Sequence, residues 1–343
     1  MAGAIMSNLE TGQENHGQGV RTAAIVTRDL AKTFQARRGA VEAVRSISLD
    51  VERGSIVGLL GPNGAGKTTT LRMLTTLLPI GRGSAQVAGF DVGREPHQVR
   101  THIGYVSQLG GSDEVLTARE NLHLQARLYG IAPMQAASRA QSLINQLELS
   151  TYADRAVKTY SGGQRRRLDI ALGIIHQPEV LFLDEPSTGL DPQSRANLWE
   201  HIRSLGAGGM TIVVTTHYLD EADALCDDVY IIDQGKIVAH GAPAVLKQQI
   251  GGTAIVLEWD TPPQASQACE LLRSAPFVRE AVLNETLLRL YVDNGSEALS
   301  ALLHRLEQAA LAAHSLRLSQ PSLDDVFLRT TGRSLREETV EVH

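Results

Sequence analysis

The sequence predicts an α/β fold in which helices cover both faces of a sheet. Short runs rich in β-branched residues alternate with longer helical patterns from residue 21 to about residue 250, which is typical of that class. One of these runs leads through a glycine-rich loop into a helical pattern at Thr69–Leu78. The expected strands are Ile47–Val51, Ile56–Leu60, Val180–Leu183, Thr211–Thr215 and Val229–Ile232.

Residues 117–172 interrupt this alternation with a pattern that is almost wholly helical. Apolar residues recur there at helical spacing, at Leu122, Ala126, Leu128, Leu143, Ile144, Leu147 and Leu149. We therefore expect a helical subdomain, inserted into the sheet-forming part of the chain.

A second pattern of strand, helix, two strands, helix and strand begins after Gly251–Thr253. The order βαββαβ is that of ferredoxin-like domains, and it predicts a small α+β domain over residues 252–332. Because this domain carries no cluster of titratable residues at catalytic spacing, we expect an accessory or dimerisation role. Its elements are expected at Ala254–Trp259, Gln264–Ser274, Val278–Leu283, Thr286–Val292, Ser296–Ala310 and His314–Leu318.

A last short helix is expected after Pro321, within the stretch SLDDVFLRTTG. Four of its residues would form an apolar face that needs covering, namely Leu323, Val326, Phe327 and Leu328. We expect a second copy or another partner to cover that face.

The ends of the chain and its composition limit the possible functions. Residues 1–20 are polar and glycine-rich, and residues 333–343 form an acidic tail; both are expected to be disordered. The formal net charge of −6 gives no overall electrostatic reason to bind nucleic acid. No stretch approaches the roughly 18 consecutive apolar residues that a membrane span requires. The two cysteines, Cys226 and Cys269, lack metal-ligand spacing, which favours a reducing compartment.

The glycine-rich stretch that follows the strand Ile56–Leu60 fits the phosphate-binding pattern G-x-x-x-x-G-K-[ST]. Its glycines let backbone N–H groups converge on phosphates, while Lys67 supplies a cation and Thr68 a hydroxyl ligand for Mg²⁺. A chance match is the alternative, which the setting between a strand and a helix disfavours. The stretch comprises Gly61, Pro62, Asn63, Gly64, Ala65, Gly66, Lys67, Thr68 and Thr69.

Two acids, Asp184 and Glu185, end a second apolar strand in the stretch VLFLDEP. The carboxyl ends of strands are where ligands bind in α/β proteins. Asp184 fits the oxygen shell of Mg²⁺, and Glu185 fits a group that orients or deprotonates an attacking water. Alone, such a pair could merely cap a helix; together with the phosphate loop it predicts a hydrolysis site.

Five stretches in this order resemble the nucleotide-binding subunit of ABC (ATP-binding cassette) transporters: GPNGAGKTT, YSGGQRRRLDIAL, VLFLDEP, STGLD and TTH. The resemblance covers about residues 21–250 and implies a P-loop NTPase of the ABC type, with ATP and Mg²⁺ as cofactors. It also implies that two subunits face head to tail, so that each ATP lies between the phosphate loop of one and the signature sequence of the other. The signature residues are Ser161, Gly162, Gly163 and Gln164. Ser161 would also suit a simple helix N-cap, and both roles can hold together.

The same resemblance assigns roles to four further residues. Gln108 matches the loop glutamine that contacts Mg²⁺ or water and senses the membrane partner, and His217 matches the switch histidine beside the γ-phosphate. Asp191 matches a loop that crosses the dimer interface, and Phe34 matches the aromatic that stacks on adenine. The sequence departs from the common pattern at Tyr160, where Leu is usual, and at Phe34, where Tyr is frequent; neither change removes a phosphate contact.

The run Arg165–Arg167 follows the signature glycines. It lacks the interleaved aromatics and basic surroundings of a nucleic-acid site, so we expect a solvated or membrane-facing helix surface. The helix dipole disfavours arginine in a first turn, and the sequence offers no account of that cost.

Within the family, the ending PSLDDVFLRTTGR and the stretch around TTHYLDEADALCDD look like the drug-exporter branch, typified by daunorubicin/doxorubicin-resistance ATP-binding subunits. This resemblance implies a peripheral subunit at the cytoplasmic face of the membrane, in a homodimer that drives separate transmembrane permease subunits to export a drug or lipid-like compound. The helical subdomain and the Gln108 loop would form the groove for a short helix of that permease, although the apolar residues there could equally form an internal core. Alternatives are a polysaccharide or other export system, or a soluble cassette ATPase without transport.

Overall fold

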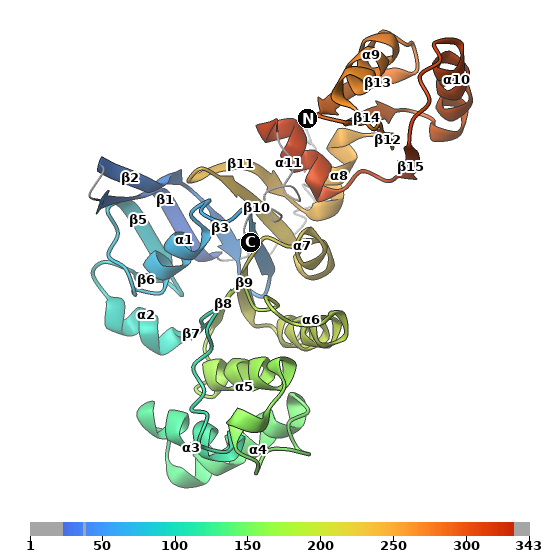
Figure 1. Cartoon of the computed structure of the whole chain (residues 1–343). Helices are drawn as coiled ribbons and strands as arrows, with labels where there is room; N and C mark the ends of the chain where they lie inside the picture. Colours follow the sequence, from blue (N-terminus) through green and yellow to red (C-terminus); the bar gives the residue numbers. More distant parts are fainter. Residues whose placement is uncertain (1–22, 37–38, 333–343) are drawn as a thin grey trace, which may run out of the picture.

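The computed structural model describes residues 23–36 and 39–332 (Figure 1). The expected disordered tails, residues 1–20 and 333–343, lie outside the described residues. No helix in the described part of the chain is both long and apolar enough to cross a bilayer.

Six of the described strands form a central sheet in the order β11-β10-β4-β9-β8-β7. Neighbouring strands from β10 to β7 are parallel, and β11 is an antiparallel edge. The strands β4, β8 and β9 are buried along their whole length, as expected for parallel strands covered on both faces. The bounds are β4 Ile56–Leu60, β7 Ile103–Val106, β8 Val180–Asp184, β9 Thr211–Thr216, β10 Asp228–Asp233 and β11 Lys236–Gly241.

A second sheet, which the sequence reading missed, is antiparallel and has the order β2-β1-β5-β6, with β3 paired to β1. The prediction of one strand at Ile47–Val51 is wrong, because these residues are divided between the end of β2 and the start of β3. Thr27 separates the two parts: its hydroxyl donates to the carbonyl of Ile47 and accepts the N–H of Leu49. The bounds are β1 Ala23–Ala36, β2 Gly39–Ile47, β3 Asp50–Glu52, β5 Arg82–Val87 and β6 Phe90–Asp91.

Helices and the second sheet cover the two faces of the central sheet. Alternate residues of β4 face opposite ways: Val57 and Leu59 pack with the antiparallel sheet and α1, whereas Ile56 and Leu60 pack with helices of the other face. This arrangement confirms the predicted α/β class. The helix expected at Thr69–Leu78 instead spans only Lys67–Leu74, since the backbone turns left-handed at Thr76, whose φ is 62°. The other helices here are α2 Pro96–His102, α6 Pro192–Ala207, α7 Leu219–Leu225 and α8 Pro243–Ile250.

The predicted helical subdomain is present between β7 and β8 and extends away from the sheets in Figure 1. Most of its predicted apolar residues are buried, including Leu122, Ala126 and Ile144. Leu128 is the exception, because 74% of it is exposed. The elements are α3 Ala118–Leu128, α4 Pro133–Gln146, a 3₁₀ turn at Val157–Thr159 and α5 Gly162–Ile174.

The predicted order βαββαβ is present after α8, and its strands form an antiparallel sheet in the order β13-β14-β12-β15. α9 and α10 pack on one face of this sheet, around a separate core that includes Leu257, Leu272 and Leu302. The ferredoxin-like class and the boundary near residue 252 stay predictions, which this topology supports. The bounds are β12 Thr253–Glu258, α9 Pro262–Arg273, β13 Val278–Asn284, β14 Leu287–Val292, α10 Gly295–Gln308 and β15 Ser315–Ser319.

The last helix, α11 Leu323–Thr331, returns to the central sheet and packs against α8, β11 and α7 (Figure 1). Phe327 lies in the same hydrophobic core as Leu246 and Ile250 of α8. On the side of the small domain, Arg289 of β14 pairs with Asp324 at 3.0 Å, and the Tyr291 hydroxyl donates to Asp325 at 2.8 Å. The expectation that another chain covers the apolar face of this helix is therefore wrong, because α8, β11 and α7 cover it within the chain.

Phe327→Ala should destabilise the protein by about 3–5 kcal/mol, because the ring is fully buried between α11 and α8. Denaturant unfolding measures this change. Leu318→Ala on the exposed edge of β15 is the control and should change stability by less than about 0.5 kcal/mol. Equal effects of the two substitutions would contradict the packing of α11.

Candidate active site

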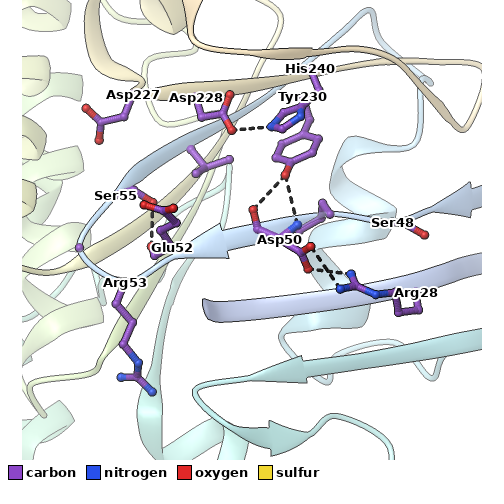
Figure 2. A pocket seen from close by; sticks show the side chains of 13 residues that line it. Arg28, Ser48, Asp50, Glu52, Arg53, Ser55, Asp227, Asp228, Tyr230 and His240 are labelled. Carbon is purple, nitrogen blue, oxygen red and sulfur yellow. Dashed lines mark hydrogen bonds and ion pairs between the residues drawn. The ribbon is translucent and has the colours of Figure 1, made fainter. Parts of the chain in front are cut away.

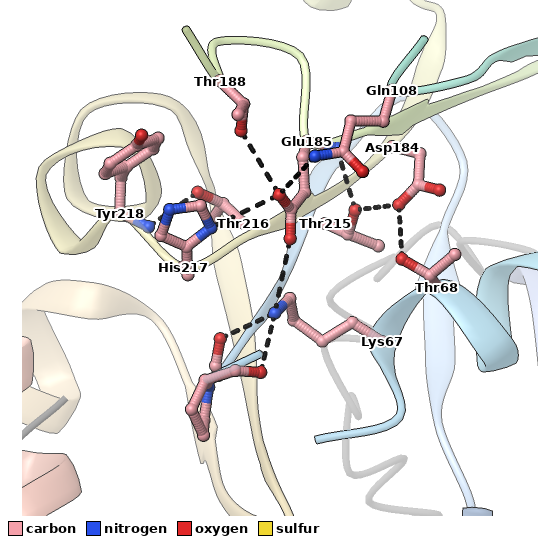
Figure 3. Close-up of polar contacts among 12 residues, drawn as sticks. Lys67, Thr68, Gln108, Asp184, Glu185, Thr188, Thr215, Thr216, His217 and Tyr218 are labelled. Carbon is pink, nitrogen blue, oxygen red and sulfur yellow. Dashed lines mark hydrogen bonds and ion pairs between the residues drawn. The ribbon is translucent and has the colours of Figure 1, made fainter. Parts of the chain in front are cut away.

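The site is assembled where β4, β8 and β9 end. The parallel register pairs Leu60 with Thr216 and Asp184 with Thr215, so the loops after these strands leave the sheet side by side. The phosphate loop follows β4, Glu185 follows β8 and His217 follows β9. Three stretches far apart in sequence therefore meet at one edge (Figure 3).

The phosphate loop needs glycine at two positions for steric reasons. A Cβ atom at Gly61 would lie 2.1 Å from the carbonyl oxygen of Ile232, and one at Gly66 would lie 2.4 Å from that of Ala43. Gly66 also has a φ of 104°, in the left-handed region. It precedes α1 without a side-chain cap, so the first N–H groups of this helix stay free to bind an anion.

Lys67 is 4% exposed and points back over the phosphate loop (Figure 3). Its ammonium group donates to the carbonyls of Gly61 and Pro62 at 2.7 and 2.9 Å, and it lies 3.6 Å from Glu185 Oε1. Burial lowers the pKa of Lys67, while the negative charge of Glu185 opposes that change. A cation is thus held where phosphate groups would bind.

Glu185 lies at the centre of the polar contacts in Figure 3. Its carboxylate lies 3.4 Å from His217 Nδ1 and accepts from Gln108 Nε2 at 3.3 Å and from Thr188 Oγ1 at 3.2 Å. Burial acts to raise the pKa of Glu185, but the close contact with His217 and the charge of Lys67 outweigh it and hold the pKa below the ordinary value. The carboxylate is therefore ionised at neutral pH, as a base that orients water needs to be.

Asp184 forms a second polar group beside the first. Its Oδ1 atom accepts from the hydroxyl of Thr68 at 2.9 Å and from that of Thr215 at 2.7 Å. A carboxylate and a hydroxyl oxygen this close are the kind of donors that Mg²⁺ prefers. The donor set of Thr68 and Asp184 thus fits a magnesium ion coordinated together with phosphate oxygens.

The signature residues lie apart from these groups, at the start of α5 (Figure 1). Ser161 and Gln164 form a capping box, in which the Ser161 hydroxyl accepts the N–H of Gln164 and the Gln164 side chain accepts the N–H of Ser161. Within the described residues, no hydrogen bond joins the signature residues to Lys67, Asp184 or Glu185. The predicted N-cap of Ser161 is confirmed, while its contact with a nucleotide stays a prediction.

Two other predicted residues lie outside the polar cluster. Asp191 caps α6 by accepting the N–H of Ser194 at 2.9 Å, and its hydrogen bonds to Ser194 lower its pKa. Phe34 lies on β1, is 39% exposed and has Lys32 Nζ at 5.7 Å from the centre of its ring. Neither residue touches Lys67 or Glu185, so their assigned roles stay predictions.

Arg166 corrects the expectation of a solvated arginine surface. It is 6% exposed, and its guanidinium donates to the carbonyls of Ser107, Asp184 and Pro186 at 2.6, 2.9 and 2.8 Å. Its neighbours in the run do lie nearer the surface, where Arg165 pairs with Glu114 and Arg167 pairs with Glu148. The sequence reading missed Arg166, and the only signal was a run of three arginines near the start of a helix, where the dipole disfavours cations.

Thr215 and Thr188 are also site residues that the sequence reading did not single out. Thr188 donates its hydroxyl to the carboxylate of Glu185. Thr215 donates its hydroxyl to Asp184 and accepts the N–H of Glu185 at 3.0 Å, so it fixes both acids to β9. Its position next to the end of a buried strand, in the TTH stretch, could have indicated this role.

A hollow of about 970 Å³ lies at the opposite edge of the sheet, where β4 and β10 begin (Figure 2). Its polar groups largely satisfy one another: Arg28 pairs with Asp50, the Tyr230 hydroxyl bonds the Asp50 backbone, and His240 contacts Asp228. Ligands of α/β proteins bind at the carboxyl ends of the strands, so this hollow is not the candidate active site.

Fold and site together define a P-loop protein that hydrolyses a nucleoside triphosphate. Residues 44–188 match the family model described as ABC transporter, and residues 241–331 match the one described as ATP-binding protein DrrA1-3-like, C-terminal domain. Two solved structures share the fold. The ATP-binding subunit of an ABC transporter has a TM-score of 0.58 at 28% identity, over 66% of this chain and 93% of that chain. An ATP-binding cassette in a dimeric post-hydrolysis state with ADP and Pi has a TM-score of 0.59 at 23% identity, over 64% and 98%.

Three curated relatives match over nearly their whole length. The daunorubicin resistance ATP-binding protein DrrA2 of Streptomyces coeruleorubidus is 43% identical over 91% of this chain and 96% of its own. The daunorubicin/doxorubicin resistance ATP-binding protein DrrA of Streptomyces peucetius is 42% identical over 93% and 96%. The Nod factor export ATP-binding protein I of Ralstonia nicotianae is 36% identical over 94% and 98%. The chain belongs to the ATP-binding, ATP-hydrolysing proteins of the ABC transporter family, with a DrrA-like C-terminal part.

The lowered pKa of Glu185 predicts how the nucleotide-free protein responds to acid. A carboxylate with a depressed pKa stabilises the folded state above its unfolded pKa, and this contribution disappears as the pH falls through the folded value. Wild-type protein should thus exceed Glu185→Gln in stability at pH 7, and the difference should shrink below the ordinary pKa of 4.5. Urea unfolding at several pH values measures it, with Glu200→Gln on the exposed side of α6 as the control. A difference that grows as the pH falls would contradict the assignment.

Proposed function

We propose that this chain is the ATP-hydrolysing subunit of an ABC exporter, and that two copies bind two Mg-ATP between them in a head-to-tail dimer. The observation that carries the proposal is the meeting of Lys67, Glu185 and His217 at the end of β4, β8 and β9, while the signature residues lie elsewhere. One copy thus contains a base, a cation and a phosphate loop at a single site. The signature residues of a second copy would supply the remaining contacts to the nucleotide.

The residues of one copy divide the work at the nucleotide. The loop from Gly61 to Thr69 would bind the phosphates, with Lys67 as the cation. Thr68, Asp184 and Gln108 would hold Mg²⁺, which neutralises the charge of the phosphates when bound. Glu185 orients and deprotonates the attacking water, and His217 contacts the γ-phosphate. Phe34 would offer its ring to the adenine base.

The start of α5 supports the assignment of the signature to the other copy's nucleotide. α5 has thirteen residues, so the positive end of its dipole and the N–H groups around Gly162 and Gly163 form an anion site. Both glycines lie close to the start of α6, because a Cβ at Gly163 would meet the Ser194 side chain at 2.9 Å and one at Gly162 would meet the Leu190 side chain at 3.3 Å. The loop that carries Asp191 therefore lies beside the signature, at the surface that a second copy would cover.

A groove lined in part by Tyr105, three residues before Gln108, suits a separate membrane subunit. It has a volume of about 710 Å³ and lies between the end of α1, α2 and the end of α3. Leu77 and Leu128 line it and are 57% and 74% exposed, and Arg100 and His97 lie at the same surface. We propose that it receives a short apolar helix of a transmembrane permease and holds this chain at the cytoplasmic face of the membrane.

The relatives favour a drug or lipid-like compound as the exported substrate, because two of the three are drug-resistance proteins with about 40% identity. The Nod factor export relative keeps open the alternative of a polysaccharide or other export system. Stimulation of ATP hydrolysis in the complete complex by daunorubicin, or instead by a polysaccharide, distinguishes the two. A cassette ATPase without transport is the remaining alternative, and it would co-purify with no membrane protein.

Glu185→Gln should abolish steady ATP hydrolysis, by at least about 100-fold, because the amide cannot accept the proton of the attacking water. Binding of Mg-ATP should persist, and size-exclusion chromatography with Mg-ATP should give a stable dimer. Glu200→Gln is the control and should behave as wild type. If Glu185→Gln hydrolysed ATP at the wild-type rate, Glu185 would not be the base that activates the water.

Leu128→Glu should abolish co-purification with the membrane subunit, since it replaces one of the two exposed leucines of the groove by a charged side chain. The melting temperature of the isolated chain should not change, because the side chain is largely exposed. Leu303→Glu on α10, which is 44% exposed and distant in sequence, is the control and should keep the association. Undiminished association of Leu128→Glu with native membranes would argue against the groove as the docking site.

A further inference from the structure

Arg166 connects α5 to both loops that carry the polar groups of the site. Its guanidinium donates three hydrogen bonds to backbone carbonyls, which belong to Ser107 just after β7, to Asp184 at the end of β8 and to Pro186 just after β8. Gln108 directly follows the first of these residues, and Glu185 lies between the other two. One buried side chain thus fixes the backbone next to the two residues that contact each other at 3.3 Å.

The backbone at Glu185 needs such support because it is strained. Glu185 has a φ of 45°, in the left-handed region that non-glycine residues seldom adopt. Arg166 binds the carbonyl of Asp184, in the peptide group before Glu185, and the carbonyl of Pro186, one peptide group beyond the one that follows Glu185, so it holds the backbone on both sides of this residue. The direction of the Glu185 carboxylate follows from that backbone.

Asp169 holds the other end of the Gln108 loop. It lies three residues after Arg166 on α5 and accepts the N–H groups of Gly111 and Ser112, both at 3.1 Å. Gly110 has a φ of 80°, and a Cβ atom there would lie 2.6 Å from the Asp169 carboxylate. The loop therefore approaches α5 closely, and α5 holds it before and after Gln108.

The same helix begins with the signature. Ser161 is the N-cap of α5, so about one and a half helical turns separate it from Arg166, a distance of roughly 7–8 Å along the helix axis. This short piece of α5 therefore has the signature residues at one end, which the proposed function assigns to the second copy's nucleotide. At its other end is Arg166, which binds the backbone beside Glu185.

We propose that Arg166, on the helix that the signature begins, is a positioning residue for Glu185 and Gln108. The inference rests on the proposed function, in which Glu185 orients the attacking water. Arg166 itself touches no reacting atom in this arrangement; it acts through the carbonyls of Ser107, Asp184 and Pro186.

Arginine suits this role better than lysine or glutamine. Its planar guanidinium offers five donors in a fixed geometry, whereas lysine has a single nitrogen and glutamine has two donors on one. Three carbonyls on two loops therefore cannot be bound by either replacement. A side chain that only filled space would tolerate these substitutions as long as the protein folds.

The test is steady-state ATP hydrolysis by the full-length chain, purified as wild type, Arg166→Gln, Arg166→Lys and Arg165→Gln. Both Arg166 variants should lower kcat on the order of 10–100-fold, because a misplaced group near the reaction costs about that much. The KM for ATP and the Kd for Mg-ATP should stay within about threefold, since the phosphate loop keeps its contacts. Arg165→Gln removes an equal charge from the same turn and should keep the kcat of wild type.

Hydrogen exchange of the nucleotide-free protein provides a readout that does not depend on turnover. Peptides that cover residues 184–190 should exchange faster in both Arg166 variants than in wild type and in Arg165→Gln, since the Glu185 N–H is bonded to Thr215 only while the backbone keeps its conformation. Arg166→Lys keeps the charge and the aliphatic stem, so it serves if Arg166→Gln does not fold.

The outcomes separate this inference from the proposed function. Wild-type kcat in an Arg166 variant, or unchanged exchange at residues 184–190, would overturn the inference and leave the function standing. A fall in nucleotide affinity as large as the fall in kcat would also overturn it, because Arg166 would then support binding rather than the position of Glu185. No hydrolysis by the wild-type protein with its membrane partner would overturn both.

Discussion

The parallel pairing of β9 with both β4 and β8 is the constraint on which the site depends. Because these strands run in the same direction, the phosphate loop, the Asp184–Glu185 pair and His217 leave the sheet at one edge. Thr215 on β9 ties the arrangement together, since it bonds the side chain of Asp184 and the backbone of Glu185. A shift of one residue in this register would turn Thr215 to the other face of the sheet and separate these groups.

The charges at this edge are buried, and each one has partners. Lys67 lies against two carbonyls and Glu185, and Arg166 lies against three carbonyls, so neither cation is left unpaired away from water. Removing one partner of a buried pair would leave the other charge unpaired, which destabilises the folded state by more than the intact pair stabilises it. The same low-dielectric surroundings strengthen the contact of His217 with Glu185.

The small C-terminal domain is joined to the ATP-binding part of the chain, here called the cassette, both by the polypeptide and by the packing of side chains. α11 contributes Phe327 to the cassette core and Asp324 to an ion pair with β14 of the small domain. It also contacts α7, which begins two residues after His217. The apolar face that the sequence leaves open is thus used to dock the end of the chain on its own cassette.

The sequence by itself determined the α/β class, the helical insertion, the order of the C-terminal elements and the motifs of the family, because these features depend on local periodicity and on short stretches of adjacent residues. It could not reveal the antiparallel sheet, whose strands are exposed on one side and whose turn at Ser48 depends on Thr27 twenty-one residues earlier. Arg166 and the packing of α11 were decided only by the tertiary structure. Whether an arginine lies in solvent or against three carbonyls, and whether an apolar face meets another chain or its own, depends on which distant segments the fold brings beside it.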